Sequence, residues 1–492
     1  MAQTIQLSLV SHTNVGKTTL ARTLLGRDVG EVRDEAHVTL SADVHGLVAT
    51  PEGDRLTLWD TPGFGDSLRL AKRLAQSDNP LGWFLTQVWD RYRDRAFWSS
   101  QQAVRNVRDQ ADVVLYLVNA SENPEDAGYV IPEMRVLEWI GKPVIVLLNQ
   151  LGRPRPAAAE QAEVQRWRDH LAGQRCVRAV LAFDAFARCW VQETVLFGEL
   201  AQAVAAEKRS AFSLLSQQWL QRRREIFDAS LEALAARLAR AALDREEADA
   251  GGWSERLREV GIALGVRRDA DDSPKQLAMR ALAERLDCDI RASSDRLIAL
   301  HGLGGRASAE ILTRLANHFA VRERVSEGKA AALGGMVTGA LAGLKADLAS
   351  GGLTFGAGLL VGGVLGALGG AGIARGYNLA RGVDATIVTW SDAVLDELAQ
   401  SALLGYLAVA HYGRGRGDWA ASEYPAHWPD TVAAAFALQQ EAFAHIWSLR
   451  GDAGAELVPA LRDALGATAA DVLQRLYPGV ALGHTLEPRA GH

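Results

Sequence analysis

The sequence predicts an α/β domain with a mostly parallel sheet and helices on both faces, followed by a mainly α-helical region that contains an apolar, glycine-rich hairpin. Three patterns indicate this division. Near the N-terminus, an apolar strand leads through a glycine-containing loop into a helix. Further short apolar strands alternate with helical stretches up to about residue 183, which is typical of layered α/β domains. From residue 193 onward, Ala, Leu, Arg and Glu recur at helical spacing.

The elements follow from these patterns in chain order. Alternation of apolar and polar residues over positions 5–10 predicts the first strand, and the helix after its loop begins at Lys17 and runs to about Leu25. The other expected strands are residues 37–50, 56–60, 111–120, 142–150 and 178–183. Helices are expected within 193–324 and over 384–411, 429–449 and 456–476.

Composition sets the broad class. A length of 492 residues favours two or three domains, and 48% hydrophobic with 23% charged residues is typical of globular proteins. The net charge of −6 gives no general basic excess, so there is no strong nucleic-acid signal. Three cysteines without CxxC spacing indicate a reducing compartment, and the first ten residues do not form a secretory signal. We therefore expect a cytoplasmic protein.

The loop SHTNVGKT, residues 11–18, has the features of a phosphate-binding loop. Small residues let backbone N–H groups face phosphates, a lysine supplies positive charge, and a hydroxyl at the helix start can hold magnesium. Gly16, Lys17 and Thr18 fit this pattern, whereas Ser11 replaces the first glycine of GxxxxGK[ST]. A chance GKT in a loop is the alternative. The position between a strand and a helix favours nucleotide binding.

A second element, LTLWDTPG, ends an apolar strand in Asp60 beside a turn of small residues. An aspartate there can hold a metal-bound water, and Gly63 can offer its N–H to a terminal phosphate. Taken alone, the segment would be a simple strand-end turn. Thr39 lies between the two elements, where it could reach the metal, but the alternation around it also fits one exposed face of a strand.

SHTNVGKTTL followed by WDTPGF resembles the Era/TrmE-like branch of the translation-factor-related P-loop GTPases, whose motifs are GxxNxGK[ST] and DTPG. The resemblance covers about the first 190 residues. It implies GTP binding and hydrolysis to GDP and phosphate, with Mg²⁺ as cofactor. By this resemblance, Lys17 contacts the phosphates, Thr18 and Thr39 ligate magnesium, and Asp60 acts through a metal-bound water. The nucleotide-binding set is Asn14, Val15, Gly16, Lys17, Thr18, Thr19, Asp60 and Asn149, and the catalytic set is Lys17, Thr39 and Gly63.

Two features of this resemblance concern turnover. Some members of the branch hold a potassium ion with the loop asparagine, so Asn14 is a candidate for a K⁺ site. Phe64 stands where Ras-type enzymes carry a water-orienting glutamine. We therefore expect slow intrinsic hydrolysis, stimulated by the cation, by a partner or by a homodimer formed through the GTPase domain.

The base-recognition motif departs from the family pattern. In place of NKxD, the chain has Asn149 followed by Gln150 and Gly152. Loss of a buried acceptor pair can reduce discrimination between bases by orders of magnitude. The choice between guanine and adenine therefore stays open, with GTP favoured by the resemblance. Asp184 is a candidate replacement acceptor, although a helix N-cap is the favoured role for it.

The segment from Gly65 to Gln110 is long and rich in aromatic residues. Its rings are Trp83, Phe84, Trp89, Tyr92, Phe97 and Trp98. The spacing favours amphipathic helices packed on their own domain, and a partner-binding surface next to the nucleotide site is the alternative.

Residues 330–374 form a glycine-rich apolar segment, predicted to be a helical hairpin. Its glycines recur every four residues, at Gly335, Gly339 and Gly343 and again at Gly358, Gly362, Gly366 and Gly370. Such stripes allow close helix packing, chiefly in lipid. Residues 348–374 carry no charged side chain, which exceeds the ~20 residues needed to span a bilayer. Membrane insertion or close membrane association is favoured over a buried soluble helix pair.

These observations give the predicted organisation: a GTPase domain over 1–192, a helical region over 193–329, the hairpin over 330–374 and a C-terminal helical region over 375–492. The helical part resembles the uncharacterised region attached to some bacterial Era-like GTPases. The favoured function is a GTP-controlled switch in membrane association or remodelling, at the cytoplasmic face of the inner membrane, with lipid bound through residues 330–374. The alternatives are a soluble ribosome or RNA assembly GTPase, and a nucleotide-binding scaffold with little turnover.

Overall fold

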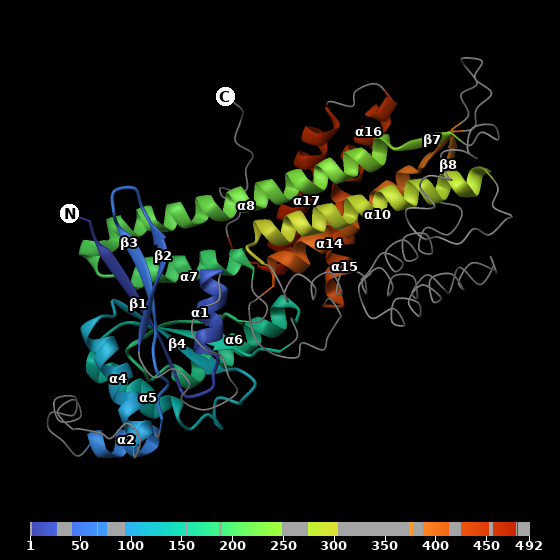
Figure 1. Ribbon diagram of the computed structural model, residues 1–492. Helices are drawn as coiled ribbons and strands as arrows, with labels where there is room; N and C mark the ends of the chain where they lie inside the picture. Colours follow the sequence, from blue (N-terminus) through green and yellow to red (C-terminus); the bar gives the residue numbers. More distant parts are fainter. Residues whose placement is uncertain are drawn as a thin grey trace. The chain divides into compact units, whose positions relative to one another are not determined.

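The computed structural model describes most of the chain and shows an α/β fold followed by long helices (Figure 1). The described residues are 2–26, 42–65, 67–75, 94–152, 155–185, 189–247, 274–303, 373–376, 387–412, 425–451, 456–478 and 480. The chain divides into two compact units. The first consists of residues 1–226, 410–419 and 473–487, and the second of residues 227–409, 420–472 and 488–492.

A six-stranded sheet forms the centre of the first unit (Figure 1). Its strands are β1 (Thr4–Ser11), β2 (Asp43–Ala49), β3 (Arg55–Asp60), β4 (Val113–Asn119), β5 (Val144–Asn149) and β6 (Val177–Ala182). The order is β2-β3-β1-β4-β5-β6, with β2 antiparallel to β3 and the other neighbours parallel. The mostly parallel sheet predicted from the sequence is therefore confirmed.

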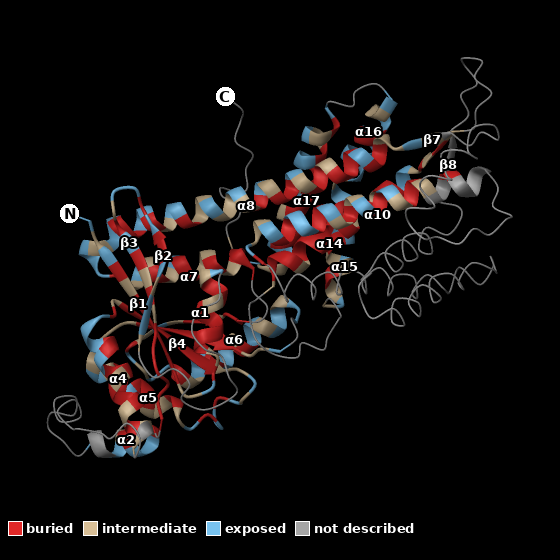
Figure 2. Cartoon of the chain, in the orientation of Figure 1, coloured by how far each residue is buried: buried red, intermediate tan, exposed pale blue. Residues whose placement is uncertain are grey.

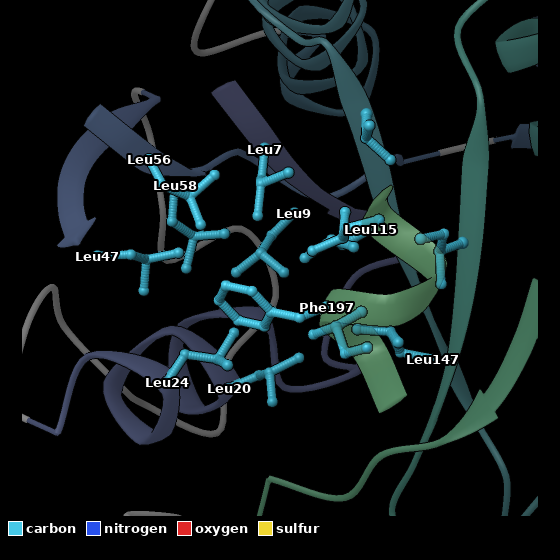
Figure 3. Close-up of a cluster of buried hydrophobic side chains, with 14 of the residues drawn as sticks. Leu7, Leu9, Leu20, Leu24, Leu47, Leu56, Leu58, Leu115, Leu147 and Phe197 are labelled. Atoms are coloured by element: carbon cyan, nitrogen blue, oxygen red, sulfur yellow. The ribbon is translucent and has the colours of Figure 1, made fainter. Parts of the chain in front are cut away.

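Helices cover both faces of this sheet. Side chains along each central strand alternate between two hydrophobic clusters, one on each face, and both clusters include helix residues. On β4, Leu115 belongs to one cluster and Tyr116 to the other. The first cluster also contains residues of α1 (Lys17–Leu25), α7 (Trp190–Ala203) and the start of α8 (Arg209–Leu243), and Figure 3 shows Leu20, Leu24 and Phe197 meeting leucines of the sheet. The second contains residues of α2 (Ser67–Leu74), α4 (Arg95–Asp109), α5 (Val130–Ile140) and α6 (Ala157–Leu171).

The aromatic segment before β4 contributes to the second cluster. Phe97 is buried there and Trp98 is half-buried, both on α4. Packing on its own domain, the favoured interpretation, is therefore confirmed for Phe97. The other aromatic residues of this segment, at positions 83, 84, 89 and 92, lie outside the described residues.

The second unit is mainly helical, as predicted. Its helices include the later part of α8, α10 (Pro274–Leu300), α14 (Asp392–Ala410), α15 (His427–Leu438), α16 (Gln440–Ser448) and α17 (Leu457–Leu476), with a short 3-10 helix, Leu449–Gly451. A small antiparallel sheet joins β7 (Arg245–Glu247), β9 (Ile387–Trp390) and β8 (Ile373–Gly376) in the order β7-β9-β8. In the first unit, another 3-10 helix, Ala206–Lys208, precedes α8.

This small sheet corrects two helix predictions. The expected helix over 384–411 begins only at Asp392, because the residues before it form β9. The sequence of β9 is Ile-Val-Thr-Trp, whose β-branched residues favour a strand with one buried face. Residues 373 and 374, the end of the predicted hairpin, lie in β8. The rest of the predicted hairpin, with its glycine stripes, lies outside the described residues.

Among the described helices, α14 has the length and apolarity required to cross a membrane. Of its most apolar 18 residues, 67% are buried inside the protein. The buried side chains include Leu395, Leu403 and Tyr406. Figure 2 shows α14 mostly in the colour of buried residues, as expected for a core helix.

Candidate functional site

The loop between β1 and α1 has a backbone that few residue types can adopt. Gly16 has φ of 94° and Asn14 has φ of 65°. Left-handed conformations favour glycine and are tolerated by asparagine. A Cβ on residue 16 would lie 2.8 Å from Nδ2 of Asn149, so any other residue there would also displace this amide. α1 begins at Lys17, directly after Gly16, and the backbone N–H groups at the start of a helix favour anions.

Lys17 is the first residue of α1, directly after this loop, and is 7% exposed. Its Nζ donates to Oγ of Ser11 at 2.9 Å, and Ser11 Oγ donates to the carbonyl of His12. Burial lowers the pKa of Lys17, while the nearby carboxylates Asp60 and Glu133 oppose that shift. The serine that replaces the first glycine of the motif therefore accepts a hydrogen bond from the ammonium group.

Thr18 and Asp60 meet at the start of α1 and the end of β3. Thr18 Oγ1 donates to Oδ2 of Asp60 at 2.6 Å. Burial raises the pKa of Asp60, and the bond from Thr18 and the charge of Lys17 oppose that shift. Oδ1 of Asp60 is buried and has no hydrogen-bond partner among the described residues. A buried carboxylate oxygen requires a partner, and a water bound to Mg²⁺ would supply one, so this pair fits a magnesium site.

The turn that follows Asp60 lies directly against the phosphate loop. The N–H of Phe64 donates to the carbonyl of Ser11 at 2.9 Å. A Cβ on Gly63 would lie 3.0 Å from Nζ of Lys17 and 3.1 Å from Cα of Thr13. The side chain of Phe64 is fully buried in the second hydrophobic cluster, so it does not face the phosphate side.

Asn149, at the end of β5, supports the loop from the neighbouring side. Its Nδ2 donates to the carbonyl of Val15 at 2.7 Å, and its Oδ1 accepts from the N–H of Ala185 at 2.8 Å. Asp184 is buried and accepts from the N–H of Leu151 at 2.7 Å. The predicted N-cap role of Asp184 is wrong, because α7 begins at residue 190 with Cys189 as its N-cap. Asp184 instead orders the segment after β5.

The structure brings most of the predicted site residues together at the carboxyl ends of the parallel strands. The loop and the start of α1 contain Asn14, Val15, Gly16, Lys17, Thr18 and Thr19, and Asp60, Gly63 and Asn149 lie around them. Thr39 lies outside the described residues. The individual functional roles stay predictions.

Sequence reasoning missed a buried polar cluster beside the loop. Glu133 of α5 is fully buried and contacts His12, Ser67 and Tyr116. Burial and the negative charge of Glu133 raise the pKa of Tyr116 well above its ordinary value. The sequence contained one indication of this cluster. Glu133 follows the apolar residues 130–132 and lies on the buried face of the helix with Met134 and Leu137. A carboxylate on such a face requires buried donors.

Comparisons with known proteins agree with the two-part organisation. Residues 6–150 match the family model described as 50S ribosome-binding GTPase, and residues 168–450 match that described as Domain of unknown function (DUF3482). GTPase Era of Heliobacterium modesticaldum is 27% identical over 145 residues, which are 30% of this chain and 39% of that protein. GTPase Der of Myxococcus xanthus is 29% identical over 150 residues, 30% of this chain and 26% of that protein.

The chain thus spans less than two fifths of the length of these curated relatives. Among solved structures, Era in complex with MgGDPNP and a segment of 16S ribosomal RNA has 17% sequence identity and a TM-score of 0.31, covering 42% of this chain and 58% of that chain. The resemblance inferred from the two sequence motifs is confirmed by the first family match. The resemblance of the helical region to an uncharacterised one is confirmed by the second.

Proposed function

The chain belongs to the family of the domain of unknown function DUF3482, and we propose that its N-terminal P-loop GTPase domain acts as a switch that binds GTP and hydrolyses it to GDP and phosphate. The observation that carries this proposal is the meeting of Lys17, the Thr18–Asp60 pair and Gly63 at one loop. These are the charge, the metal-binding groups and the N–H donor that a triphosphate requires.

Each group has a defined task in this proposal. Lys17 leaves the Ser11 hydroxyl and binds the β- and γ-phosphates, where its ammonium group offsets charge that develops during phosphoryl transfer. Thr18 and Asp60 would hold Mg²⁺, Asp60 through a metal-bound water, and the ion would neutralise charge on the phosphate oxygens. Gly63 donates its N–H to the γ-phosphate. Thr39 is the proposed second hydroxyl ligand of the metal.

We propose slow intrinsic turnover. The residue after the DTPG turn, Phe64, packs into the core and offers no group that orients water. Asn14, held in a left-handed conformation at the loop, is the proposed ligand of a K⁺ ion that would add positive charge beside the phosphates. A homodimer through the GTPase domain is the other proposed source of stimulation.

Guanine selectivity is part of the proposal and is supported by the match of residues 6–150 to a GTPase family. Asn149 is committed to the carbonyl of Val15 and the N–H of Ala185, so it supports the loop. Direct comparison of the affinities for GTP and ATP tests this selectivity. Lys17→Ala is expected to lose binding of both nucleotides, which shows that the measured binding occurs at the phosphate loop. Lys142→Ala is the matched control, because Lys142 precedes β5 and lies at the opposite ends of the parallel strands. Equal affinity for ATP and GTP would remove guanine selectivity.

For the cellular role, we propose GTP-controlled membrane association through residues 330–374, at the cytoplasmic face of the inner membrane. The supporting observation is the uncharged, glycine-striped sequence of that segment. The test is flotation of the full-length protein with liposomes in GTP and GDP, with a variant lacking residues 330–372 as the comparison. Recovery of both proteins in the non-floating fraction with either nucleotide would contradict it.

A second candidate is ribosome or RNA assembly. It is favoured by the match of residues 6–150 to a family described as 50S ribosome-binding GTPase. Nucleotide-dependent co-sedimentation of the full-length protein with ribosomal particles would support this function. A membrane-bound protein that never co-sediments with these particles would exclude it.

A further inference from the structure

The Glu133 carboxylate joins three elements of the first unit. It is fully buried on α5, and a buried carboxylate is strongly unfavourable unless hydrogen bonds compensate for lost hydration. Oε1 accepts from Nδ1 of His12 at 2.8 Å and from Oγ of Ser67, and Oε2 accepts from the hydroxyl of Tyr116 at 2.6 Å. Three donors satisfy the carboxylate.

Two of these donors belong to, or lie next to, the segments that we propose to contact phosphate. His12 follows β1 and is the second residue of the phosphate loop, where its ring stacks on Tyr129 with centroids 4.4 Å apart. Ser67 is the first residue of α2, four residues after Gly63. Its Oγ also lies 3.3 Å from Nδ1 of His12. Glu133 therefore ties the start of α2 to the phosphate loop.

Residues 61–65 of the segment after Asp60 are also attached to the sheet and to its second hydrophobic cluster. The hydroxyl of Thr61 donates to the carbonyl of Leu9, and the side chain of Phe64 is fully buried in that cluster. The N–H of Phe64 donates to the carbonyl of Ser11, and the N–H of Gly65 donates to Oγ of Ser100 at 3.0 Å. Gly63 lies between the β3 end of the segment and these bonds. Phe64, directly after Gly63, forms a β-bridge with His12, so the position of the Gly63 N–H relative to Lys17 depends on the loop residue that Glu133 holds.

We propose that Ser67, Glu133 and His12 are positioning residues for hydrolysis, which hold Gly63 where its N–H meets the γ-phosphate. This inference rests on the proposed GTPase function. GDP lacks the γ-phosphate, so the tie contributes to binding of GTP and to turnover but not to binding of GDP. The ratio of the affinities for a non-hydrolysable GTP analogue and for GDP therefore measures the positioning role of these hydrogen bonds, separately from their effect on folding.

The test uses Ser67→Ala in the full-length protein. We expect GDP affinity within about twofold of wild type, because no group that contacts the diphosphate changes. We expect the preference for the GTP analogue over GDP, and kcat per nucleotide-binding site, to fall about tenfold, since a hydrogen bond to a charged group contributes on this scale. Ser67→Thr keeps the hydroxyl and is expected to recover most of both quantities.

The matched control is Ser8→Ala. Ser8 is equally buried, on β1, and its Oγ donates to Oδ1 of Asn106 at 2.7 Å, away from the phosphate loop. It should lower the melting temperature by an amount similar to Ser67→Ala and leave kcat and the affinity ratio unchanged. The inference would be overturned if Ser67→Ala kept the wild-type kcat and affinity ratio, or if both alanine variants lost the same fraction of them. It would also be overturned if Ser67→Thr were as impaired as Ser67→Ala.

Wild-type measurements separate this inference from the function on which it rests. If the wild-type protein binds neither GTP nor GDP, the proposed function fails and the inference fails with it. If the wild type prefers GTP and hydrolyses it while Ser67→Ala behaves in the same way, only the positioning role fails.

Discussion

Replacement of Asn149 by alanine tests how the phosphate loop is supported. The side chain is fully buried and makes two hydrogen bonds to backbone groups, from Nδ2 to the carbonyl of Val15 at 2.7 Å and from the N–H of Ala185 to Oδ1 at 2.8 Å. Val15 is 4% exposed and Ala185 is fully buried, so water cannot readily replace the lost amide. Asn149→Ala therefore leaves one acceptor and one donor without their partner.

The expected magnitude follows from these two groups. An unsatisfied buried polar group costs about 1–3 kcal/mol, so the pair gives a loss of about 3 kcal/mol even at the lower half of that range. For a domain of this size, each kcal/mol shifts the melting temperature by about 2–4 °C. The transition of the GTPase domain should therefore fall by roughly 6–12 °C, and GTP affinity should fall with it because the loop carries the phosphate site.

The assay is thermal unfolding of the nucleotide-free, full-length protein, following the transition that added GDP raises. Asn119→Ala is the matched control. Asn119 ends the neighbouring strand β4, in register with Asn149, but its side chain bonds to Glu122 and to the exposed Ser121. Its loss should cost under about 1 kcal/mol. Equal shifts in both variants would refute the argument that Asn149 is a buried support.

The remaining predictions concern charge at the site. Burial raises the pKa of Asp60 above its ordinary value of 3.8, so protons compete with Mg²⁺ for this carboxylate at higher pH than for an exposed aspartate. GTP affinity in the presence of Mg²⁺, measured by calorimetry, should therefore fall as the pH is lowered from neutral toward the pKa of Asp60. Asp60→Asn should show a weaker dependence on Mg²⁺ and should lack this pH effect. Ser11→Gly frees the ammonium of Lys17 and should tighten GTP binding about twofold to tenfold in equilibrium titrations, whereas weaker binding would contradict this role. Hydrolysis should be faster in K⁺ than in Na⁺, and Asn14→Ala should remove that difference; equal wild-type rates in both salts would exclude the potassium site.

The sequence was sufficient to predict the central sheet because its strands are short, apolar and separated by helices. β4 and β5 are buried on both faces, so they appear as continuous apolar runs, as parallel strands do. The helix beginning at Lys17 and the loop before it were predicted for a local reason, since glycine, lysine and threonine at that spacing determine the turn.

Long-range contacts were not predictable in the same way. The bonds from His12, Ser67 and Tyr116 to Glu133 join residues 121, 66 and 17 positions apart, and no local pattern specifies them. The short strand β9 was predicted as helix because its partners, β7 and β8, come from distant parts of the chain. Asp184 was predicted to cap a helix, but the N-cap of α7 is Cys189, five residues later.

The departures from the family motifs acquire physical explanations in the structure. Ser11, in place of glycine, accepts a hydrogen bond from Lys17. Gln150 and Gly152 both have positive φ, so the chain after β5 turns sharply where the family carries its base-recognition residues. Asp184 then holds the N–H of Leu151 within that turn.

The central claim is that the loop carrying Lys17 hydrolyses GTP. The most direct measurement is phosphate release by the full-length protein with GTP and Mg²⁺ under single-turnover conditions, compared with Lys17→Ala. The account predicts slow release by the wild type, specific for GTP over ATP, and a loss of at least about 100-fold in the variant. Release at the same rate by both proteins, or no release by the wild type in K⁺ at saturating GTP, would contradict it.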